Sequence, residues 1–296
     1  MRTVDIKTIG FIGLGVMGEP ICRHLVLKSG RKVFGYDVAE VPFERLGGDG
    51  LVRAMSTLEL SSVCDVIFLA LPSGEHVQAV VGGDDGLIAR SREGQIVVDL
   101  GTTSVATTHA LAEQFAARQA VFVDAPIART RQAAIDADLS VMVGAAGPLY
   151  ETLLPLIRCF ASDVTACGAV GHGQIVKILN NMVLTETVVA LAEALTIGQA
   201  AGVDADLLFK TLAKGSADSF ALRNHGMKAL LPGVFPERAF SARYMQKDID
   251  YALALARDCG QRPAGAELAN GLLARAIAAG DGDRYWPVLV RSMGVN

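Results

Sequence analysis

The chain of 296 residues has few cysteines, and they lack any metal-binding spacing. The five cysteines are odd in number and scattered, with no C-x-x-C pair, which argues against a disulfide framework and against a zinc site. The five histidines are scattered in the same way. We therefore expect no bound metal, and we expect the cysteines to be buried thiols in the reducing environment of the cytoplasm.

A strong charge excess and a long uninterrupted apolar run are also missing. The net charge of −4 and the pI near 5.8 argue against nucleic acid as a partner. Asp5 and Lys7 lie where a signal peptide needs an apolar core, so no secretory leader is predicted. The most apolar stretch, residues 175–200, is interrupted by Lys177, Asn180, Asn181, Glu186 and Glu193, so we expect no membrane span. Neither a G-x-S-x-G elbow nor a P-loop occurs.

The most informative pattern that is present is G-x-G-x-x-G at Gly13, Gly15 and Gly18, between an apolar run and a helical one. Residues without a β-carbon let backbone amides approach a dinucleotide pyrophosphate at a helix N-terminus. The motif alone is weak, but a second strand is predicted at residues 32–36, and Asp37 stands at its end, 19 positions after Gly18. A carboxylate there accepts hydrogen bonds from the adenosine ribose and repels a 2′-phosphate, which predicts NAD rather than NADP.

Short β-rich runs alternate with helical segments up to about residue 168. They lie at residues 7–12, 32–36, 66–71, 96–99, 121–124 and 140–143, with a weaker one at 163–166. This alternation predicts an α/β fold in which residues 1–168 form an NAD-binding Rossmann domain with a doubly wound, mostly parallel sheet. Polar loops follow the strands at the edge where such folds bind ligands.

The β-rich runs stop after residue 168, and the rest of the chain has helical patterns. A long helix of roughly 40 Å is predicted over residues 173–201, followed by helices at about 204–214, 219–229, 243–258 and 263–279. Residues 169–296 are therefore predicted to form an all-helical domain for substrate binding and dimerisation, joined to the first by the long central helix. Asp204, Asp206, Asp248 and Asp250 are interpreted as carboxylates at helix starts or on exposed faces.

A second candidate site lies at the start of the long helix. Lys177 and Asn181 are four residues apart, hence on one face, in apolar surroundings where an ammonium needs a cavity or a partner. Gly171 and Gly173 allow another backbone or a ligand to approach closely. Hydride transfer to or from a nicotinamide requires one proton to move at the substrate oxygen, which a lysine performs. The alternative is a lysine that extends to solvent, with Asn181 bonded to a neighbouring helix.

Several motifs in order make the chain resemble the β-hydroxyacid dehydrogenase family over nearly its whole length. They are Phe11 to Gly18 with Pro20, Leu71-Pro72-Ser73, Asp99 with Thr102, Asp124-Ala125-Pro126, the helix with Gly173, Lys177 and Asn181, and Lys247-Asp248. The resemblance implies that Lys177 is the catalytic acid/base and that Asn181 orients the substrate. It implies coenzyme contacts from Gly13, Leu14, Gly15, Val16, Met17, Gly18, Asp37, Leu71, Pro72, Thr102 and Lys247. It also implies a homodimer or homotetramer built around the long helix.

The chain departs from the family pattern where Asp-Ala-Pro-Val-Ser-Gly-Gly becomes Asp-Ala-Pro-Ile-Ala-Arg-Thr at residues 124–130, and where D-x-S-T loses its serine at Gly101. Arg129 would then stand in the substrate pocket, where its guanidinium suits a carboxylate, sulfonate or phosphate. This replacement, the paired asparagines and residues 283–286 resemble sulfolactaldehyde reductase. The substrate-binding residues implied are Arg129, Thr130, Lys177, Asn180, Asn181 and Leu184. The alternative is that Arg129, near Arg131, belongs to a solvated basic loop.

The resulting hypothesis is an NAD-dependent oxidoreductase that interconverts a small 3-hydroxy acid and its semialdehyde, with Arg129 as an anion clamp. Its partner would be a small anionic hydroxy acid or semialdehyde. A sulfonate substrate is one alternative, and an imine reductase is another, although those enzymes generally lack the lysine. A protein that binds NAD without turnover is the third.

Overall fold

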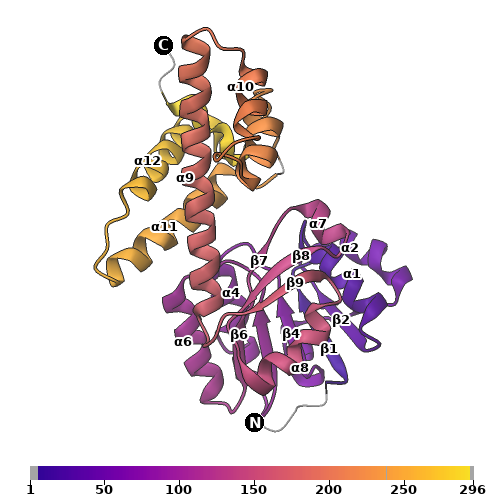
Figure 1. The fold of residues 1–296 in the computed structure, drawn as a ribbon. Coiled ribbons are helices and arrows are strands. Elements are labelled where there is room, and N and C mark those ends of the chain that lie inside the picture. The colour runs from indigo at the N-terminus through magenta and orange to yellow at the C-terminus, as the bar shows by residue number, and fades with distance from the viewer. Residues whose placement is uncertain (1–5, 238, 294–296) are drawn as a thin grey trace. The chain divides into compact units, whose positions relative to one another are not determined.

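The computed structural model describes residues 6–237 and 239–293, and the chain divides into two compact units, residues 1–177 and 178–296. The division falls inside the long helix α9 (His172–Ala200), whereas the sequence places the boundary just before that helix. Figure 1 shows the strands gathered in the first unit and helices making up the second.

A six-stranded parallel sheet forms the centre of the first unit, in the order β3-β2-β1-β4-β5-β6. Its strands are β1 (Thr8–Ile12), β2 (Lys32–Tyr36), β3 (Val52–Arg53), β4 (Val66–Leu69), β5 (Ile96–Asp99) and β6 (Val121–Asp124). This order confirms the predicted doubly wound sheet, with its switch of direction between β1 and β4. The edge strand β3 has only two residues, too few to produce a recognisable alternation in the sequence.

Helices cover both faces of this sheet, and alternate strand residues point to opposite faces. Phe11 and Phe68 belong to one core with α1 (Gly18–Lys28) and α8 (Gly147–Ile157). Ile67 and Val97 belong to the other, with α3 (Thr57–Val63), α4 (Gly74–Val81), α5 (Leu87–Arg90) and α6 (Val105–Ala116). Short helices α2 (Val41–Leu46), η1 (Gly47–Asp49) and α7 (Arg131–Ile135) complete the unit. Because both faces are buried, the strands read as nearly continuous apolar runs.

A separate three-stranded sheet follows β6. It contains β7 (Ile127–Ala128), β8 (Leu139–Val143) and β9 (Ala161–Ala166), with β7 antiparallel and β9 parallel to β8. The sequence predicts the last two of these strands, but not that they leave the main sheet. An apolar run predicts a strand, whereas the identity of its partner depends on contacts distant in sequence.

The second unit is helical, as predicted, and its core surrounds Trp286 and Phe209. After α9 come α10 (Ala205–Leu212), the π-helix η2 (Leu222–Leu230), α11 (Ala242–Asp258), α12 (Ala264–Ala276), the short π-helix η3 (Ile277–Asp281) and the 3-10 helix η4 (Trp286–Ser292). The side chain of Asp204 caps α10 by accepting from the Leu207 N–H at 2.8 Å, which confirms its interpretation as a helix-start residue.

The thiols of Cys22, Cys64 and Cys159 are buried, but Cys259 is exposed and Cys167 is partly so, so the expectation that all five are buried is wrong. Helix α9 is long and apolar enough to cross a membrane, with a mean hydropathy of 1.5, a property that the core helices of globular domains share.

Candidate active site

The glycine loop joins β1 to α1 at the point where the strand order reverses. A β-carbon at Gly13, whose φ is +93°, would lie 2.4 Å from the Ala70 carbonyl oxygen, and one at Gly18 would lie 1.8 Å from that of Gly13. Both glycines are therefore required by the packing of the loop. A β-carbon at Gly15 would meet no atom within 4 Å. Open space above a bare backbone at a helix N-terminus fits the pyrophosphate of a dinucleotide.

Asp37 follows β2 and is held against the same loop. Its Oδ2 accepts a hydrogen bond from the Leu14 N–H at 2.5 Å, and its Oδ1 accepts one from the Ala39 N–H at 2.7 Å. Each carboxylate oxygen has more than one lone pair, so the group retains capacity for ribose hydroxyls. The carboxylate thus lies beside the glycine loop, where the sequence placed it.

Three other residues expected to contact the coenzyme follow neighbouring strands, whereas Lys247 lies on α11 (Ala242–Asp258). Leu71 and Pro72 come after β4 and Thr102 after β5, so all three lie at the carboxyl edge of the sheet. The Val16 side chain in the glycine loop is 57% exposed, and Met17 packs against the core. An apolar side chain left open at this edge is available to cover a ligand.

A buried carboxylate holds the start of α9. Asp124, at the end of β6, accepts hydrogen bonds from the Gly171 N–H at Oδ1 (2.7 Å) and from the Gln174 N–H at Oδ2 (2.8 Å). Burial raises the pKa of Asp124, while these N–H donors oppose the rise. A β-carbon at Gly173 would lie 2.8 Å from Asp124 Oδ2 and 2.3 Å from the Met142 carbonyl oxygen. The lack of a side chain at Gly173 therefore allows another backbone to approach closely, which is one of the two possibilities predicted from the sequence.

Lys177 and Asn181 follow on successive turns of α9. Lys177 is half-buried and Asn181 is 3% exposed. The Asn181 Nδ2 donates to Asp248 Oδ2 at 2.6 Å, and its Oδ1 accepts from the Asn180 Nδ2 at 3.1 Å. Because Asp248 lies on α11, Asn181 makes the bond to a neighbouring helix that the alternative interpretation foresaw. This bond fixes the orientation of the amide.

The predicted exposure of Asp248 is wrong. It was expected on an exposed face, but it is 1% exposed, and its Oδ1 pairs with the Lys247 ammonium at 2.8 Å. The Lys247 Nζ also lies 5.0 Å and 4.8 Å from the ring centroids of Tyr244 and Tyr251. Asp248 falls on the helical stripe of buried residues that includes Met245 and Ala252, and this periodicity was the signal available in the sequence.

Comparison with known proteins identifies the family. Residues 8–168 match the family described as the NAD binding domain of 6-phosphogluconate dehydrogenase, and residues 171–291 match the one described as NAD-binding of NADP-dependent 3-hydroxyisobutyrate dehydrogenase. The chain belongs to the β-hydroxyacid dehydrogenase family. As a β-hydroxyacid dehydrogenase, it is an oxidoreductase of hydroxy acids that uses a nicotinamide dinucleotide.

Known proteins align with most of the length of this β-hydroxyacid dehydrogenase. It is 30% identical to 2-(hydroxymethyl)glutarate dehydrogenase of Eubacterium barkeri, over 84% of this chain and 82% of the relative. It is 32% identical to 3-hydroxyisobutyrate dehydrogenase of Pseudomonas aeruginosa, over 84% and 85%. The structure of Mycobacterium tuberculosis 3-hydroxyisobutyrate dehydrogenase with L-serine has a TM-score of 0.87 at 26% identity, covering 97% and 99% of the two chains.

Arg129 of this dehydrogenase is engaged with acidic groups. Its Nη1 donates to the Asp138 carbonyl (2.6 Å), to Asp138 Oδ1 (2.7 Å) and to Ser162 Oγ (2.9 Å), and its Nη2 lies 3.9 Å from Asp163 Oδ2. Arg129 and Arg131 are both exposed, as the alternative of a solvated basic loop expects, and the Arg129 guanidinium is bound to acidic neighbours. A substrate anion at this guanidinium would compete with Asp138.

The other predicted substrate residues have local contacts. Thr130 caps α7, with its Oγ1 accepting from the Ala133 N–H at 3.3 Å. Asn180 is exposed on α9, and Leu184, one turn further, is half-buried and packs against the core of the second unit. Leu184 is seven residues after Lys177, so the two share a face of α9.

Proposed function

We propose that this β-hydroxyacid dehydrogenase uses NAD to interconvert a small acid that carries a 3-hydroxyl and its semialdehyde. The observation that supports this most directly is the position of half-buried Lys177. It lies on α9 just after the first turn, whose backbone N–H groups donate to Asp124 at the coenzyme-binding edge of the sheet. Similarity to dehydrogenases of hydroxymethylglutarate and of hydroxyisobutyrate supports the substrate class. The preference for NAD is supported by the carboxylate of Asp37 beside the glycine loop.

In this proposal, Lys177 moves the proton. The coenzyme supplies or accepts the hydride, and the Lys177 ammonium donates a proton to the aldehyde oxygen during reduction. In the oxidation of the alcohol, neutral Lys177 accepts the hydroxyl proton. Asn181, oriented by Asp248, holds that oxygen in place. Because oxidation requires neutral Lys177, the oxidation rate should rise toward alkaline pH.

The experiment that tests the proposal compares Lys177→Met with Lys210→Met. Lys210 is an exposed lysine paired with Asp206 on α10. The substrates to screen are 3-hydroxyisobutyrate, 3-hydroxypropionate, glycerate, 4-hydroxybutyrate and dihydroxypropanesulfonate. We expect Lys177→Met to lower kcat by about 10²-fold or more while NADH still binds, because general acid catalysis contributes that much. The Lys210 variant should match the wild type.

Two results would reject the proposed mechanism. Turnover by Lys177→Met at the wild-type rate would remove the lysine from proton transfer. If the wild-type protein binds NADH but turns over none of the acids or their semialdehydes, the result would favour the alternative of a protein that binds NAD without turnover.

A sulfonate substrate is the second candidate, and the arginine at residue 129 favours it. Arg129 has a φ of +84°, a backbone conformation that costs a residue with a β-carbon about 1–2 kcal/mol, and such strain often marks functional positions. If Arg129 binds the substrate anion, Asp138→Asn should free the guanidinium and improve kcat/KM, and Arg129→Ala should lower it. The ratio of kcat/KM for dihydroxypropanesulfonate and 3-hydroxyisobutyrate measures the preference. An unchanged ratio in Arg129→Ala would remove the arginine from substrate recognition.

We also propose the homo-oligomer that the family resemblance implies. Exposed apolar side chains lie at helical spacing along α9, namely Val176, Leu179, Val183 and Ile197. A second copy covering them would remove this apolar surface from water. Sedimentation of the purified protein tests the proposal, and a monomer at micromolar concentration would contradict it.

A further inference from the structure

The fully buried side chain of Gln174 lies on the first turn of α9 and has no part in the coenzyme motif or in proton transfer. Its Oε1 accepts a hydrogen bond from the Thr103 N–H at 3.1 Å, and its Nε2 donates to the Gly101 carbonyl at 2.9 Å. These two backbone groups lie on either side of Thr102. One amide therefore holds the loop that carries a predicted coenzyme contact.

Other hydrogen bonds fix both the Thr102 loop and the start of α9, the two parts that Gln174 connects. On the loop side, Asp99 Oδ1 accepts from the Gly101 N–H at 2.8 Å, and its Oδ2 accepts from the Thr103 hydroxyl at 2.6 Å. On the helix side, Asp124 accepts from the backbone N–H groups of Gly171 and of Gln174 itself. Two buried carboxylates, at the ends of the adjacent strands β5 and β6, thus fix the two parts that Gln174 connects.

We infer that Gln174 is a positioning residue, which sets where Lys177 lies relative to the Thr102 loop. This inference rests on the proposed function, because it assigns a purpose to the placement of Lys177. Gln174 and Lys177 are three residues apart on one helix, so a rotation of this turn about the helix axis moves both side chains. Proton transfer requires a short distance, and a displacement of about 1 Å can lower the rate by about 10²-fold.

The chemistry of the side chain explains why an amide is needed. Gln174 acts as donor and acceptor at once, toward a carbonyl and an N–H. An ionised carboxylate can accept from the Thr103 N–H, but it would face the Gly101 carbonyl oxygen without a proton. A protonated carboxylic acid can make both bonds. The substitution Gln174→Glu should therefore work in its acid form and fail in its ionised form.

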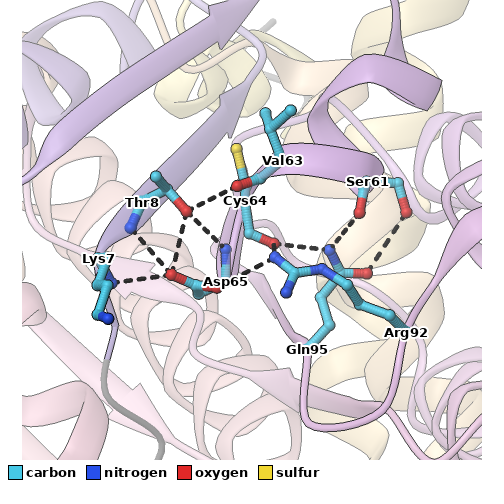
Figure 2. Close-up of polar contacts among 8 residues, drawn as sticks. All are labelled: Lys7, Thr8, Ser61, Val63, Cys64, Asp65, Arg92 and Gln95. Atoms are coloured by element: carbon cyan, nitrogen blue, oxygen red, sulfur yellow. Dashed lines mark hydrogen bonds and ion pairs between the residues drawn. The ribbon is translucent and has the colours of Figure 1, made fainter.

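Gln95 provides a matched control at the opposite end of β5, the strand that leads into the Thr102 loop. It is 2% exposed, directly precedes β5, and donates through Nε2 to the Ser61 and Cys64 carbonyls at 2.8 Å each. Figure 2 shows this buried amide among the polar contacts at the amino end of the sheet, where Arg92 and Asp65 also lie. Replacing it removes the same kind of bonds, away from the coenzyme edge.

The test uses the full chain with Gln174→Met, Gln174→Glu, Gln95→Met and Gln95→Glu, measuring Tm and the kcat for semialdehyde reduction from pH 5 to pH 8. We expect both Met variants to lower Tm, but only Gln174→Met to lower kcat, by about 10²-fold. In Gln174→Glu, the kcat relative to wild type should recover as the pH falls, whereas that of Gln95→Glu should not change with pH. This recovery is a readout that a purely structural role would not produce.

The outcomes separate this inference from the proposed function. If Gln174→Met retains kcat as the Gln95 control does, or Gln174→Glu keeps a constant ratio to wild type at every pH, the positioning role is wrong. If Gln174→Met fails to fold, the pH dependence of Gln174→Glu decides alone. Wild-type turnover by Lys177→Met would instead refute the proposed function, whatever the Gln174 variants do.

Discussion

Replacing the glycines of the coenzyme loop one at a time by alanine should separate folding from coenzyme binding. A β-carbon at Gly18 would lie 1.8 Å from the Gly13 carbonyl oxygen and 2.9 Å from its carbon, so backbone must move. Overpacking of this kind costs about 1–3 kcal/mol or more. At about 2–4 °C per kcal/mol, Gly18→Ala should lower Tm by several degrees.

Gly15→Ala should behave in the opposite way. The added methyl would meet no atom within 4 Å, and the φ of Gly15 is not positive, so the folded chain accepts it without strain. The substitution should leave stability unchanged or raise it by about 0.4–1 kcal/mol, because it restricts the unfolded chain. The methyl would, however, stand where pyrophosphate oxygens approach the loop. Losing one or two hydrogen bonds to a charged group, at about 1.5–3 kcal/mol each, weakens NADH binding at least tenfold.

Thermal unfolding and NADH fluorescence titration of the two variants measure these effects separately. The expected pattern is a low Tm for Gly18→Ala, and a normal Tm with weak NADH binding for Gly15→Ala. A folded Gly15→Ala protein that binds NADH as tightly as the wild type would refute the assignment of the open space to the coenzyme. An unchanged Tm for Gly18→Ala would refute the packing argument.

Three further predictions concern single side chains. Asp37→Asn should raise kcat/KM for NADP relative to NAD, and an unaltered preference would show that the carboxylate does not face the ribose. Burial, with a smaller contribution from Lys228, lowers the pKa of His225 to about 4 from the usual 6.5. Between pH 6.5 and pH 4 only the unfolded chain binds this proton, so the free energy of unfolding should fall by about 3 kcal/mol as the pH drops from 6.5 to 4. In urea unfolding, the fall measured for His225→Gln over the same pH range should be smaller by that amount. Asp248→Ala should destabilise the protein by about 3 kcal/mol, since it removes the ion pair with Lys247 and the acceptor of the buried Asn181 amide, and equal urea midpoints would contradict this.

The sequence alone determined the features that depend on local spacing. Strand and helix periods are set within a few residues, so β2, β5, β6 and α9 were predicted to within one residue at each end. The glycine spacing, with Asp37 one strand later, located the coenzyme edge for the same reason. The shared face of Lys177 and Asn181 follows from their separation of four residues on a helix.

Only the tertiary structure decided which distant groups meet. The partners of Arg129, the burial of Asp248 and the separate sheet of β7, β8 and β9 depend on surfaces brought together by folding. Gln174 is the clearest case, because its partner Thr103 lies 71 residues earlier in the chain. A single sequence contains the periodicity of each element, but the pairing of polar groups follows from how elements pack, since a buried donor or acceptor must find whichever partner packing brings within reach.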